Sequence, residues 1–238
     1  MDFQGRIALV TGGTGALGST IVLDLLASGA HVAASYTVET EWHHFVTRAR
    51  EWKARLTGIP VDLTEADEVR IAVNNVLNAH KRIDFLLAIA GGFASGKIHE
   101  TSEADWDRMM NFNLKTLFSV LRPVIPVMLK QNFGRIITVS SGAILSGPGA
   151  GIAAYAVSKA AVRHLSEILA EEVSGNNIRV HCLLPGTMDT EANRRAMPSA
   201  DRSQWVKTEE VARRVHALLV DGADAPLAIP ILHPGEGG

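Results

Sequence analysis

Residues 6–18 read Arg-Ile-Ala-Leu-Val-Thr-Gly-Gly-Thr-Gly-Ala-Leu-Gly, in which a short apolar run ends in a cluster of glycines. The run over residues 6–11 has the length and composition of a buried strand. Apolar residues then recur at helical spacing from Ala16 to Ser28, and Gly29 stands where a helix commonly ends. The sequence therefore predicts a strand, a glycine turn and a helix in direct succession.

This succession is the context in which a glycine-rich turn binds a dinucleotide. Glycines let the backbone approach a pyrophosphate closely, while the N–H groups and the positive dipole end of the following helix attract its negative charge. The residues predicted to form this part of the site are Gly12, Thr14, Gly15, Ala16, Leu17 and Gly18.

A tyrosine and a lysine four residues apart form the second informative motif, Tyr155-Ala156-Val157-Ser158-Lys159. This spacing places both side chains on one face of a helix. A phenol ordinarily keeps its proton up to a pH of about 10. An ammonium group nearby favours the phenolate and lowers the phenol's pKa. The pair therefore predicts a proton donor that works near neutral pH.

Seven strand-like runs alternate with helical stretches along the chain. They lie near residues 6–11, 31–35, 57–62, 83–90, 134–140, 178–184 and 227–232. Such alternation predicts an α/β fold, namely a single Rossmann-type domain over residues 1–238 with a doubly wound parallel sheet of about seven strands. A cofactor is expected at the carboxyl ends of these strands.

Composition narrows the range of partners. The 238 residues, 47% of them hydrophobic, suffice for one α/β core. A net charge of −2 gives no electrostatic footprint for nucleic acid or an anionic membrane. There is no signal-peptide pattern and no apolar run of the ~20 residues that span a bilayer. The single cysteine, Cys182, has no disulfide partner, which suits a reducing compartment. We expect a cytoplasmic protein with no nucleic-acid or membrane partner.

Taken in order, the motifs resemble the short-chain dehydrogenase/reductase family. The resemblance rests on Thr11-Gly12-x-x-x-Ala16-x-Gly18 and on a serine followed by Tyr155-x-x-x-Lys159, and it runs through nearly the whole chain. It implies a catalytic tetrad of Asn113, Ser141, Tyr155 and Lys159. In such a tetrad the serine polarises the substrate oxygen and the tyrosine donates the proton. The lysine holds the cofactor ribose and lowers the tyrosine's pKa, and the asparagine positions a water molecule.

The same resemblance implies further cofactor contacts. Asp62-Leu63 looks like the acidic segment that lies against the adenine, and residues 185–190 look like the segment that brackets the nicotinamide. Residues 88–92, Ala-Ile-Ala-Gly-Gly, lack the two asparagines usual in the family after the fourth strand, so support for this turn must come from elsewhere. The contacts expected are Asp62, Leu63, Ala90, Gly91, Gly92, Tyr155, Lys159, Pro185, Gly186, Thr187, Met188 and Thr190.

The serine of the tetrad has competing candidates. The separation between Ser141 and Tyr155 is one residue longer than is usual in the family, which leaves Ser140 as an alternative. Alignment of Val139-Ser-Ser-Gly favours Ser141, and Ser146 is a weaker contender.

The segment from Asp189 to Lys207 is the longest without a core pattern, and we interpret it as a substrate loop that closes over the site, with a solvated connection as the alternative. Its residues, like Ala90-Gly91-Gly92-Phe93-Ala94, are similar to those of dihydropteridine reductases. This similarity implies that the substrate contacts Phe93, Asn193, Met197 and Trp205 in addition to Ser141. Those reductases lack the serine, so the tetrad favours a general carbonyl reductase and the loop favours a planar, pterin-like substrate.

The choice between NAD and NADP turns on the end of the second strand, where an acidic residue would bind the ribose hydroxyls. The family's acidic position holds Tyr36, and no arginine is present there to receive a 2′-phosphate. The hydroxyl groups of Ser35, Tyr36 and Thr37 favour NADP(H) over NAD(H), although Glu39 could reach the ribose if the turn bends back.

The sequence thus predicts an NAD(P)-dependent oxidoreductase that transfers a hydride between a nicotinamide cofactor and a small ketone, aldehyde or alcohol. Reduction of a quinonoid pterin is the alternative, and a non-catalytic dinucleotide sensor is disfavoured because it needs no proton donor. The adjacent His43 and His44 point in different directions on a helix, so no metal site is expected. The alanine-rich helix from Ile152 to about Val173 resembles one that packs on its twin in this family, which implies a homotetramer or homodimer; the same alanines could instead pack on the sheet.

Overall fold

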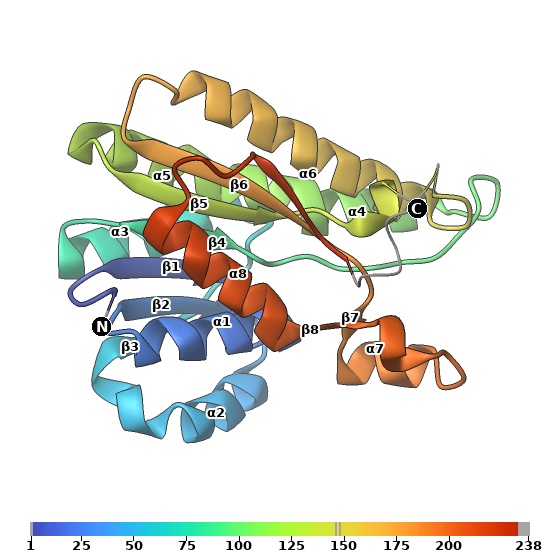
Figure 1. Ribbon diagram of the computed structural model, residues 1–238, viewed down its shortest axis with the longest axis horizontal. Coiled ribbons are helices and arrows are strands. Elements are labelled where there is room, and N and C mark those ends of the chain that lie inside the picture. The colour runs from blue at the N-terminus through green and yellow to red at the C-terminus, as the bar shows by residue number, and fades with distance from the viewer. Residues whose placement is uncertain (1, 146, 148, 233–238) are drawn as a thin grey trace.

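A seven-stranded parallel sheet forms the centre of the computed structural model, which describes residues 2–145, 147 and 149–232. The strand order is β3-β2-β1-β4-β5-β6-β9 (Figure 1). The strands are β1 (Ile7–Thr11), β2 (His31–Tyr36), β3 (Leu56–Pro60), β4 (Phe85–Ala88), β5 (Gly134–Val139), β6 (Ile178–Pro185) and β9 (Ala228–Ile231). The prediction of a doubly wound sheet of about seven strands is confirmed.

Helices cover both faces of the sheet (Figure 1). They are α1 (Ala16–Ala27), α2 (Glu39–Arg48), α3 (Ala66–His80), α4 (Glu103–Met109), α5 (Thr116–Gln131), α6 (Ala153–Glu172), α7 (Glu191–Ala196) and α8 (Thr208–Asp221). Short 3-10 helices lie at Arg50–Arg55, Gly142–Ile144 and Arg202–Gln204. A π-helical turn at Met110–Lys115 joins α4 to α5.

Two hydrophobic cores lie on opposite faces of the sheet. Ala8 and Val10 of β1 pack with α1 and α8, whereas Ile7 and Leu9 pack with α3, α5 and α6. Successive side chains of a strand point to opposite faces, and a parallel sheet with helices on both sides must bury both sets. This explains why the strands read as continuous apolar runs in the sequence.

The strand order reverses direction between β1 and β4, which lie side by side in the centre of the sheet. Strands β1, β2 and β3 follow one another toward one edge of the sheet, and β4, β5 and β6 follow one another toward the other edge. Such a switch point leaves a crevice at the carboxyl ends of the strands, where ligands of this architecture bind. The glycine turn after β1 and the turn after β4 meet there.

The helical stretch Glu103–Gln131 is long and apolar enough, by length and composition alone, to cross a membrane. In the fold, 44% of its apolar window is buried, and α5 lies against α3 and the sheet. The core helix of a soluble protein passes the same test, so length and composition alone are weak evidence of a membrane span.

The segment 189–207 differs from the predicted irregular loop. A two-residue strand, β7 (Met188–Asp189), pairs in parallel with β8 (Val206–Lys207), and α7 lies between them. The Thr190 hydroxyl caps α7 by accepting a hydrogen bond from the Asn193 N–H at 3.2 Å. Arg194 donates to both carboxylate oxygens of Asp189, at 2.6 and 2.7 Å. Elements this short rest on caps and a single pairing, so hydrophobic periodicity cannot reveal them.

Candidate active site

The glycine turn forms a cradle that excludes side chains. Gly12 has φ +66, and a Cβ added there would lie 3.0 Å from the Ala90 Cα. A Cβ on Gly18 would lie 2.1 Å from the Gly12 carbonyl oxygen, so any larger residue would force the turn apart. Helix α1 begins directly after Gly15, and no side chain of the described chain caps this end. Open backbone at a helix N-terminus fits the pyrophosphate of a dinucleotide.

The turn after β4 is held by side chains from two other elements. The Thr11 hydroxyl at the end of β1 accepts hydrogen bonds from the N–H groups of Ile89 (3.0 Å) and Ala90 (3.1 Å). The Asn113 amide bonds Gly92 twice, accepting from its N–H at 2.9 Å and donating to its carbonyl at 3.1 Å. These contacts supply the support that the missing asparagines would otherwise give.

Asn113 also connects this turn to the helix that carries the tyrosine and lysine. Its Nδ2 donates to the Ser158 hydroxyl at 3.0 Å, and that hydroxyl donates to the Tyr155 carbonyl oxygen at 2.7 Å. Asn113 is only 2% exposed and lies in the π-helical turn. Ser158 is a supporting residue that the sequence did not reveal, because the contact spans 45 positions of the chain.

Lys159 is buried beside these groups. Its Nζ donates to the Val139 carbonyl oxygen at 2.9 Å, and a Cβ on Gly91 would lie 3.1 Å from it. Burial lowers the pKa of Lys159 to about 8, against a smaller opposing effect of Cys182. An ammonium with a pKa this close to neutrality can both hold and release a proton.

Tyr155 lies on the same face of α6, with its ring centroid 6.0 Å from Lys159 Nζ. Burial raises the pKa of Tyr155, and a hydrogen bond with Ser141 opposes that rise. The direction differs from the expected lowering by Lys159, because the phenol is removed from water while the ammonium bonds the Val139 carbonyl. Sequence spacing indicates a shared helix face, but it does not report burial.

The two candidate serines have different partners. The Ser140 hydroxyl is buried and donates to the Lys159 carbonyl oxygen at 2.7 Å, which fixes the start of the loop against α6. The Ser141 hydroxyl accepts from the Ala143 N–H at 3.2 Å, and Ser141 lies near enough to Tyr155 to oppose the rise in its pKa. Ser141 is therefore the serine that meets the tyrosine, whereas Ser146 lies outside the described residues.

At the end of β2, the expected ribose contacts are largely engaged within the protein. The Ser35 hydroxyl is buried and accepts from the Gly12 N–H at 3.1 Å. The Tyr36 hydroxyl donates to Glu39 at 2.9 Å, and its ring stacks on Trp42 at 4.9 Å between centroids. Thr37 is exposed. A second carboxylate, that of Glu41, accepts from the Thr14 hydroxyl at 3.2 Å, within the glycine turn.

The segment after β3 is ordered by its own side chains. Asp62 accepts from the Thr64 N–H at 2.8 Å and the Thr64 hydroxyl at 2.7 Å, and these bonds lower its pKa. The Asp62 N–H donates to Glu68 of α3 at 2.9 Å, and Leu63 is half-buried. These contacts leave the exposed Asp62 carboxylate held at the edge of the crevice.

The segment 185–190 leaves β6 and crosses to α7. Gly186 donates its N–H to the Ile231 carbonyl at 2.9 Å, which ties the turn to β9. The Thr187 carbonyl accepts from the Val206 N–H at 2.8 Å, alongside the pairing of Met188 in β7. The backbone of this segment is thus fixed at the carboxyl end of the sheet.

The residues predicted to line the substrate fall into two groups. Phe93 is 64% exposed and meets the Tyr155 ring edge to face, with centroids 4.9 Å apart, and Met197 is also exposed. Asn193 donates to the Met188 carbonyl at 2.8 Å, and Trp205 is 8% exposed. The first two side chains are exposed, and of these Phe93 contacts the tyrosine, whereas the last two hold the segment in place.

Comparison with known proteins places this geometry in context. The family model described as short chain dehydrogenase matches residues 6–201. The chain is 31% identical over 229 residues to the 3-oxoacyl-[acyl-carrier-protein] reductase of Thermotoga maritima, covering 93% of each chain. It is 30% identical to dehydrogenase/reductase SDR family member 4 of Homo sapiens, covering 88% of this chain and 76% of that protein. A structure of NAD+-bound xylitol dehydrogenase superposes with a TM-score of 0.88 at 26% identity, covering 98% of this chain and 100% of the other.

Proposed function

The chain belongs to the short-chain dehydrogenase family and is an NAD(P)-dependent oxidoreductase acting on carbonyl or alcohol groups; on that premise, we propose that Asn113, Ser141, Tyr155 and Lys159 form its catalytic set. The observation that carries this proposal is that Ser141 and the buried Lys159 both lie beside Tyr155: Ser141 opposes the rise in the pKa of the phenol, and Lys159 shares its helix face. A nicotinamide supplies or accepts the hydride when it is bound.

The proposed roles follow from the chemistry of each group. In reduction, Ser141 donates a hydrogen bond to the substrate oxygen, and Tyr155 gives its phenolic proton to that oxygen as the carbonyl becomes an alcohol. Lys159 stabilises the phenolate that is left and returns a proton to it. Asn113 holds Gly92 and, through Ser158, the Tyr155 backbone, so it positions the groups that react. A water molecule held by Asn113 toward Lys159 remains part of this proposal.

The substrate side of the site supports a neutral, largely apolar carbonyl compound with a flat portion. Phe93 is an exposed apolar side chain that contacts the tyrosine ring, and the predicted substrate residue Met197 is also exposed. The Phe93 ring stands edge to face against Tyr155, a geometry that favours an aromatic or conjugated neighbour. Because Ser141 lies beside Tyr155, both hydroxyl groups can polarise one carbonyl oxygen, which favours a carbonyl substrate over a quinonoid pterin.

We favour NAD(H) over NADP(H) as the cofactor, in contrast to the preference drawn from the sequence. The Ser35 hydroxyl is buried and used by Gly12, and the Tyr36 hydroxyl is used by Glu39. Glu41 adds a second carboxylate beside the glycine turn. A 2′-phosphate near these two carboxylates would be repelled, whereas ribose hydroxyl groups can donate hydrogen bonds to them.

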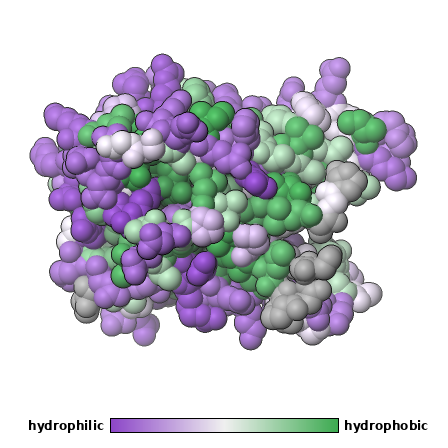
Figure 2. All heavy atoms as spheres, turned by 45° about the horizontal axis from the view of Figure 1, so that its top comes forward, coloured by the Kyte–Doolittle hydropathy of each residue, from purple (hydrophilic) through white to green (hydrophobic). Residues whose placement is uncertain are grey.

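We also propose that a second copy of the chain packs on α5 and α6. Their outer faces carry exposed apolar side chains, among them Phe118, Leu129, Val157 and Ile168. Figure 2 shows hydrophobic residues gathered in a band across one face of the molecule, flanked by hydrophilic residues. Exposed apolar patches of this kind often mark protein interfaces. A cytoplasmic location remains our expectation, because Cys182 is the single cysteine of the sequence and suits a reducing compartment.

The test measures oxidation of NADH and NADPH against aromatic ketones, aliphatic ketones, carboxylate-bearing ketones and quinonoid dihydropterin, with native protein and Ser141→Ala. We expect NADH-dependent reduction of neutral aromatic ketones, and a fall of roughly 10²-fold in kcat/KM in the variant. Pterin reduction that survives Ser141→Ala, without ketone reduction by native protein, would instead support the dihydropteridine reductase alternative.

A further inference from the structure

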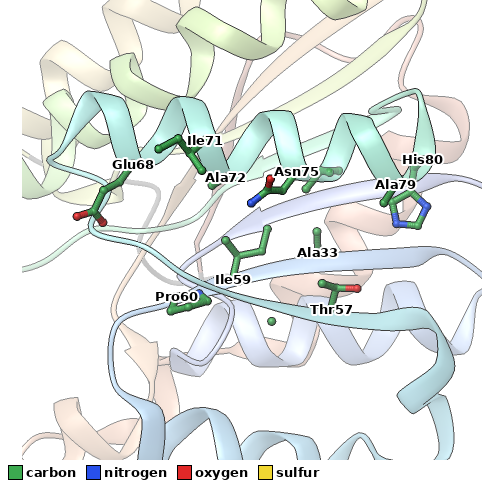
Figure 3. A pocket seen from close by; sticks show the side chains of 12 residues that line it. Ala33, Thr57, Ile59, Pro60, Glu68, Ile71, Ala72, Asn75, Ala79 and His80 are labelled. Carbon is green, nitrogen blue, oxygen red and sulfur yellow. The ribbon is translucent and has the colours of Figure 1, made fainter.

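A surface groove of about 420 Å³ lies between β3 and α3, at the edge of the sheet (Figure 3). β3 is the edge strand on this side of the sheet, and α3 lies over it (Figure 3). The groove is lined from the sheet by Thr57 and Ile59 and from the helix by the face that carries Ile71, Asn75 and Ala79. None of the four proposed catalytic residues lies on these two elements.

Small residues account for the space. Ala33 of β2 forms part of the lining, and Ala72 and Ala79 of α3 face it from above. Ile59 rises from β3 toward the helix and, together with the 53% exposed Ile71, gives the groove an apolar wall. Larger residues at the alanine positions would close the gap, so the hollow is a property of this particular sequence.

Polar side chains lie at the ends and along one wall. Figure 3 shows Glu68 at one end of the groove and His80 at the other, with Asn75 between them on the helix. The lining includes no lysine or arginine among the described residues. Burial and the nearby His31 lower the pKa of His80, which leaves its imidazole neutral at neutral pH. The groove therefore carries one negative charge, at the Glu68 end.

The geometry points to a binding site for a small organic cation, with an apolar body along Ile59 and Ile71 and an ammonium or amidinium group paired with Glu68. The volume lies within the roughly 300–1,000 Å³ of small-molecule sites, which are mostly apolar with a few polar groups that fix orientation. Asn75 provides a hydrogen-bonding side chain along the wall. The site is separate from the hydride-transfer site and does not depend on the proposed catalytic roles.

One contact links the groove to the crevice. Glu68 accepts a hydrogen bond from the Asp62 N–H at 2.9 Å, and Asp62 belongs to the segment expected to lie against the adenine. A cation paired with Glu68 would share this carboxylate with the Asp62 N–H, because a carboxylate accepts several hydrogen bonds. Binding in the groove therefore changes the hydrogen bond that holds the Asp62 turn, although the two sites do not overlap.

The test uses 4-phenylbutylammonium as the probe and 4-phenylbutanol as its neutral counterpart, with binding followed by calorimetry and by backbone amide shifts in NMR spectra. We expect saturable binding of the ammonium to native protein in the presence of saturating NAD+, with the largest shifts in residues 57–60 and 68–80. The alcohol should bind about two- to five-fold more weakly.

Three variants distinguish binding in the groove from nonspecific binding elsewhere on the protein. Glu68→Gln keeps an acceptor for the Asp62 N–H but removes the charge, and it should weaken the ammonium by about two- to five-fold without affecting the alcohol. Ala72→Leu fills the groove and should abolish binding of both probes. Asp67→Asn alters the neighbouring carboxylate, which pairs with Arg70 outside the groove, and should change nothing.

The proposal is overturned if no saturable binding occurs, or if NAD+ displaces the ammonium. It is also overturned if alcohol and ammonium bind equally well, or if Ala72→Leu binds as native protein does. Circular dichroism and the unfolding midpoint of each variant establish that it is folded, and Ala72→Val serves as a smaller filling change should the leucine unfold the chain.

Discussion

At the carboxyl end of the sheet, the ammonium of Lys159 is bonded to a backbone carbonyl, whereas at the amino end the buried charge of Asp84 is bonded to two arginines. The Asp84 carboxylate is fully buried and binds Arg6, Arg82 and the Ile7 N–H. The two guanidinium groups balance the charge of this carboxylate. A buried charge that meets only a carbonyl has its pKa moved toward neutrality.

The difference between these two sets of partners distinguishes a charge that stabilises the fold from a charge that can take part in proton transfer. The amino end holds its strands together with charges that never need to change, while the carboxyl end keeps a lysine with a pKa of about 8 next to a tyrosine. A proton can be exchanged near neutral pH only where a group is poised in this way. Changes at the two ends should therefore have different consequences, and the predictions below separate them.

The largest effect on stability is expected from Asp84→Asn. The change leaves two arginine side chains and a backbone N–H without their carboxylate, and we expect a loss of about 3 kcal/mol in the free energy of unfolding. Urea denaturation measures it, with the exposed Asp67→Asn as a control that should stay within about 0.5 kcal/mol of native protein. Activity per folded molecule should not change. A specific loss of kcat in Asp84→Asn would contradict the proposal that the amino end contributes to stability and the carboxyl end to catalysis.

Asn113→Ala should affect both stability and activity, because the buried amide bonds Gly92 and Ser158. Leaving these partners unsatisfied costs about 1–3 kcal/mol, and the turn beside Lys159 loses its position. We expect a lower kcat together with weaker cofactor binding, measured by turnover and NADH fluorescence. Asn111→Ala, in the same π-helical turn, is the matched control; equal losses in both variants would show that Asn113 has no special role.

His216 provides a pH-dependent prediction at the amino end. Burial alone would lower its pKa, but hydrogen bonds with Asp24 (2.8 Å) and Asp2 (3.0 Å) outweigh that effect, and the pKa is raised. The stability from these pairs is thus fully present below the unfolded pKa of about 6.5 and is lost as the pH rises through the folded value. His216→Ala should be about 1–2 kcal/mol less stable than native protein at pH 5.5.

The same comparison at pH 9 completes this test. The part that depends on the imidazolium charge should have disappeared, which leaves the packing of the ring against Phe3 and the hydrogen bond of the neutral imidazole. Denaturation curves at both pH values measure it. A difference that stays constant or grows with pH would contradict the assignment of the raised pKa to the two carboxylates.

The smallest effect is expected from Glu39→Gln, at the end of β2. Removing one carboxylate should raise the ratio of NADPH to NADH efficiency by about two- to five-fold, since the side chain is well exposed. Ratios of kcat/KM for the two cofactors measure it, with the exposed Glu51→Gln as a control. An unchanged ratio would mean that Glu39 does not act on the ribose end.

Periodicity and turn chemistry predicted the sheet, because the pattern of buried strands and the glycines at residues 12–18 depend on local sequence. The supports of the site depend instead on contacts between distant positions. Thr11 holds Ala90, and Asn113 holds Ser158, across 79 and 45 positions respectively. Their residue types permit these bonds, but no spacing rule indicates them. The sequence also left Ser140 and Ser141 as alternatives, because only the fold determines which hydroxyl meets Tyr155.

Burial and internal hydrogen bonds explain other differences between the predictions from the sequence and the structure. The sequence indicated that Lys159 lowers the pKa of Tyr155, whereas burial raises it, because the depth of a side chain depends on the packing of several elements. The hydroxyl groups of Ser35 and Tyr36 were counted as cofactor contacts, yet both bond partners within the protein. The elements α7, β7 and β8 were missed because each is too short to show a period.

The measurement that tests the account most directly compares native protein with Tyr155→Phe, with NADH binding followed by fluorescence and ketone reduction followed by absorbance at 340 nm. The variant should bind NADH within about two-fold of native protein while kcat falls by roughly 10²- to 10⁴-fold, because it keeps the ring and loses only the proton donor. A variant that binds NADH normally and still reduces the ketone at the native rate would contradict the claim that Tyr155 supplies the proton.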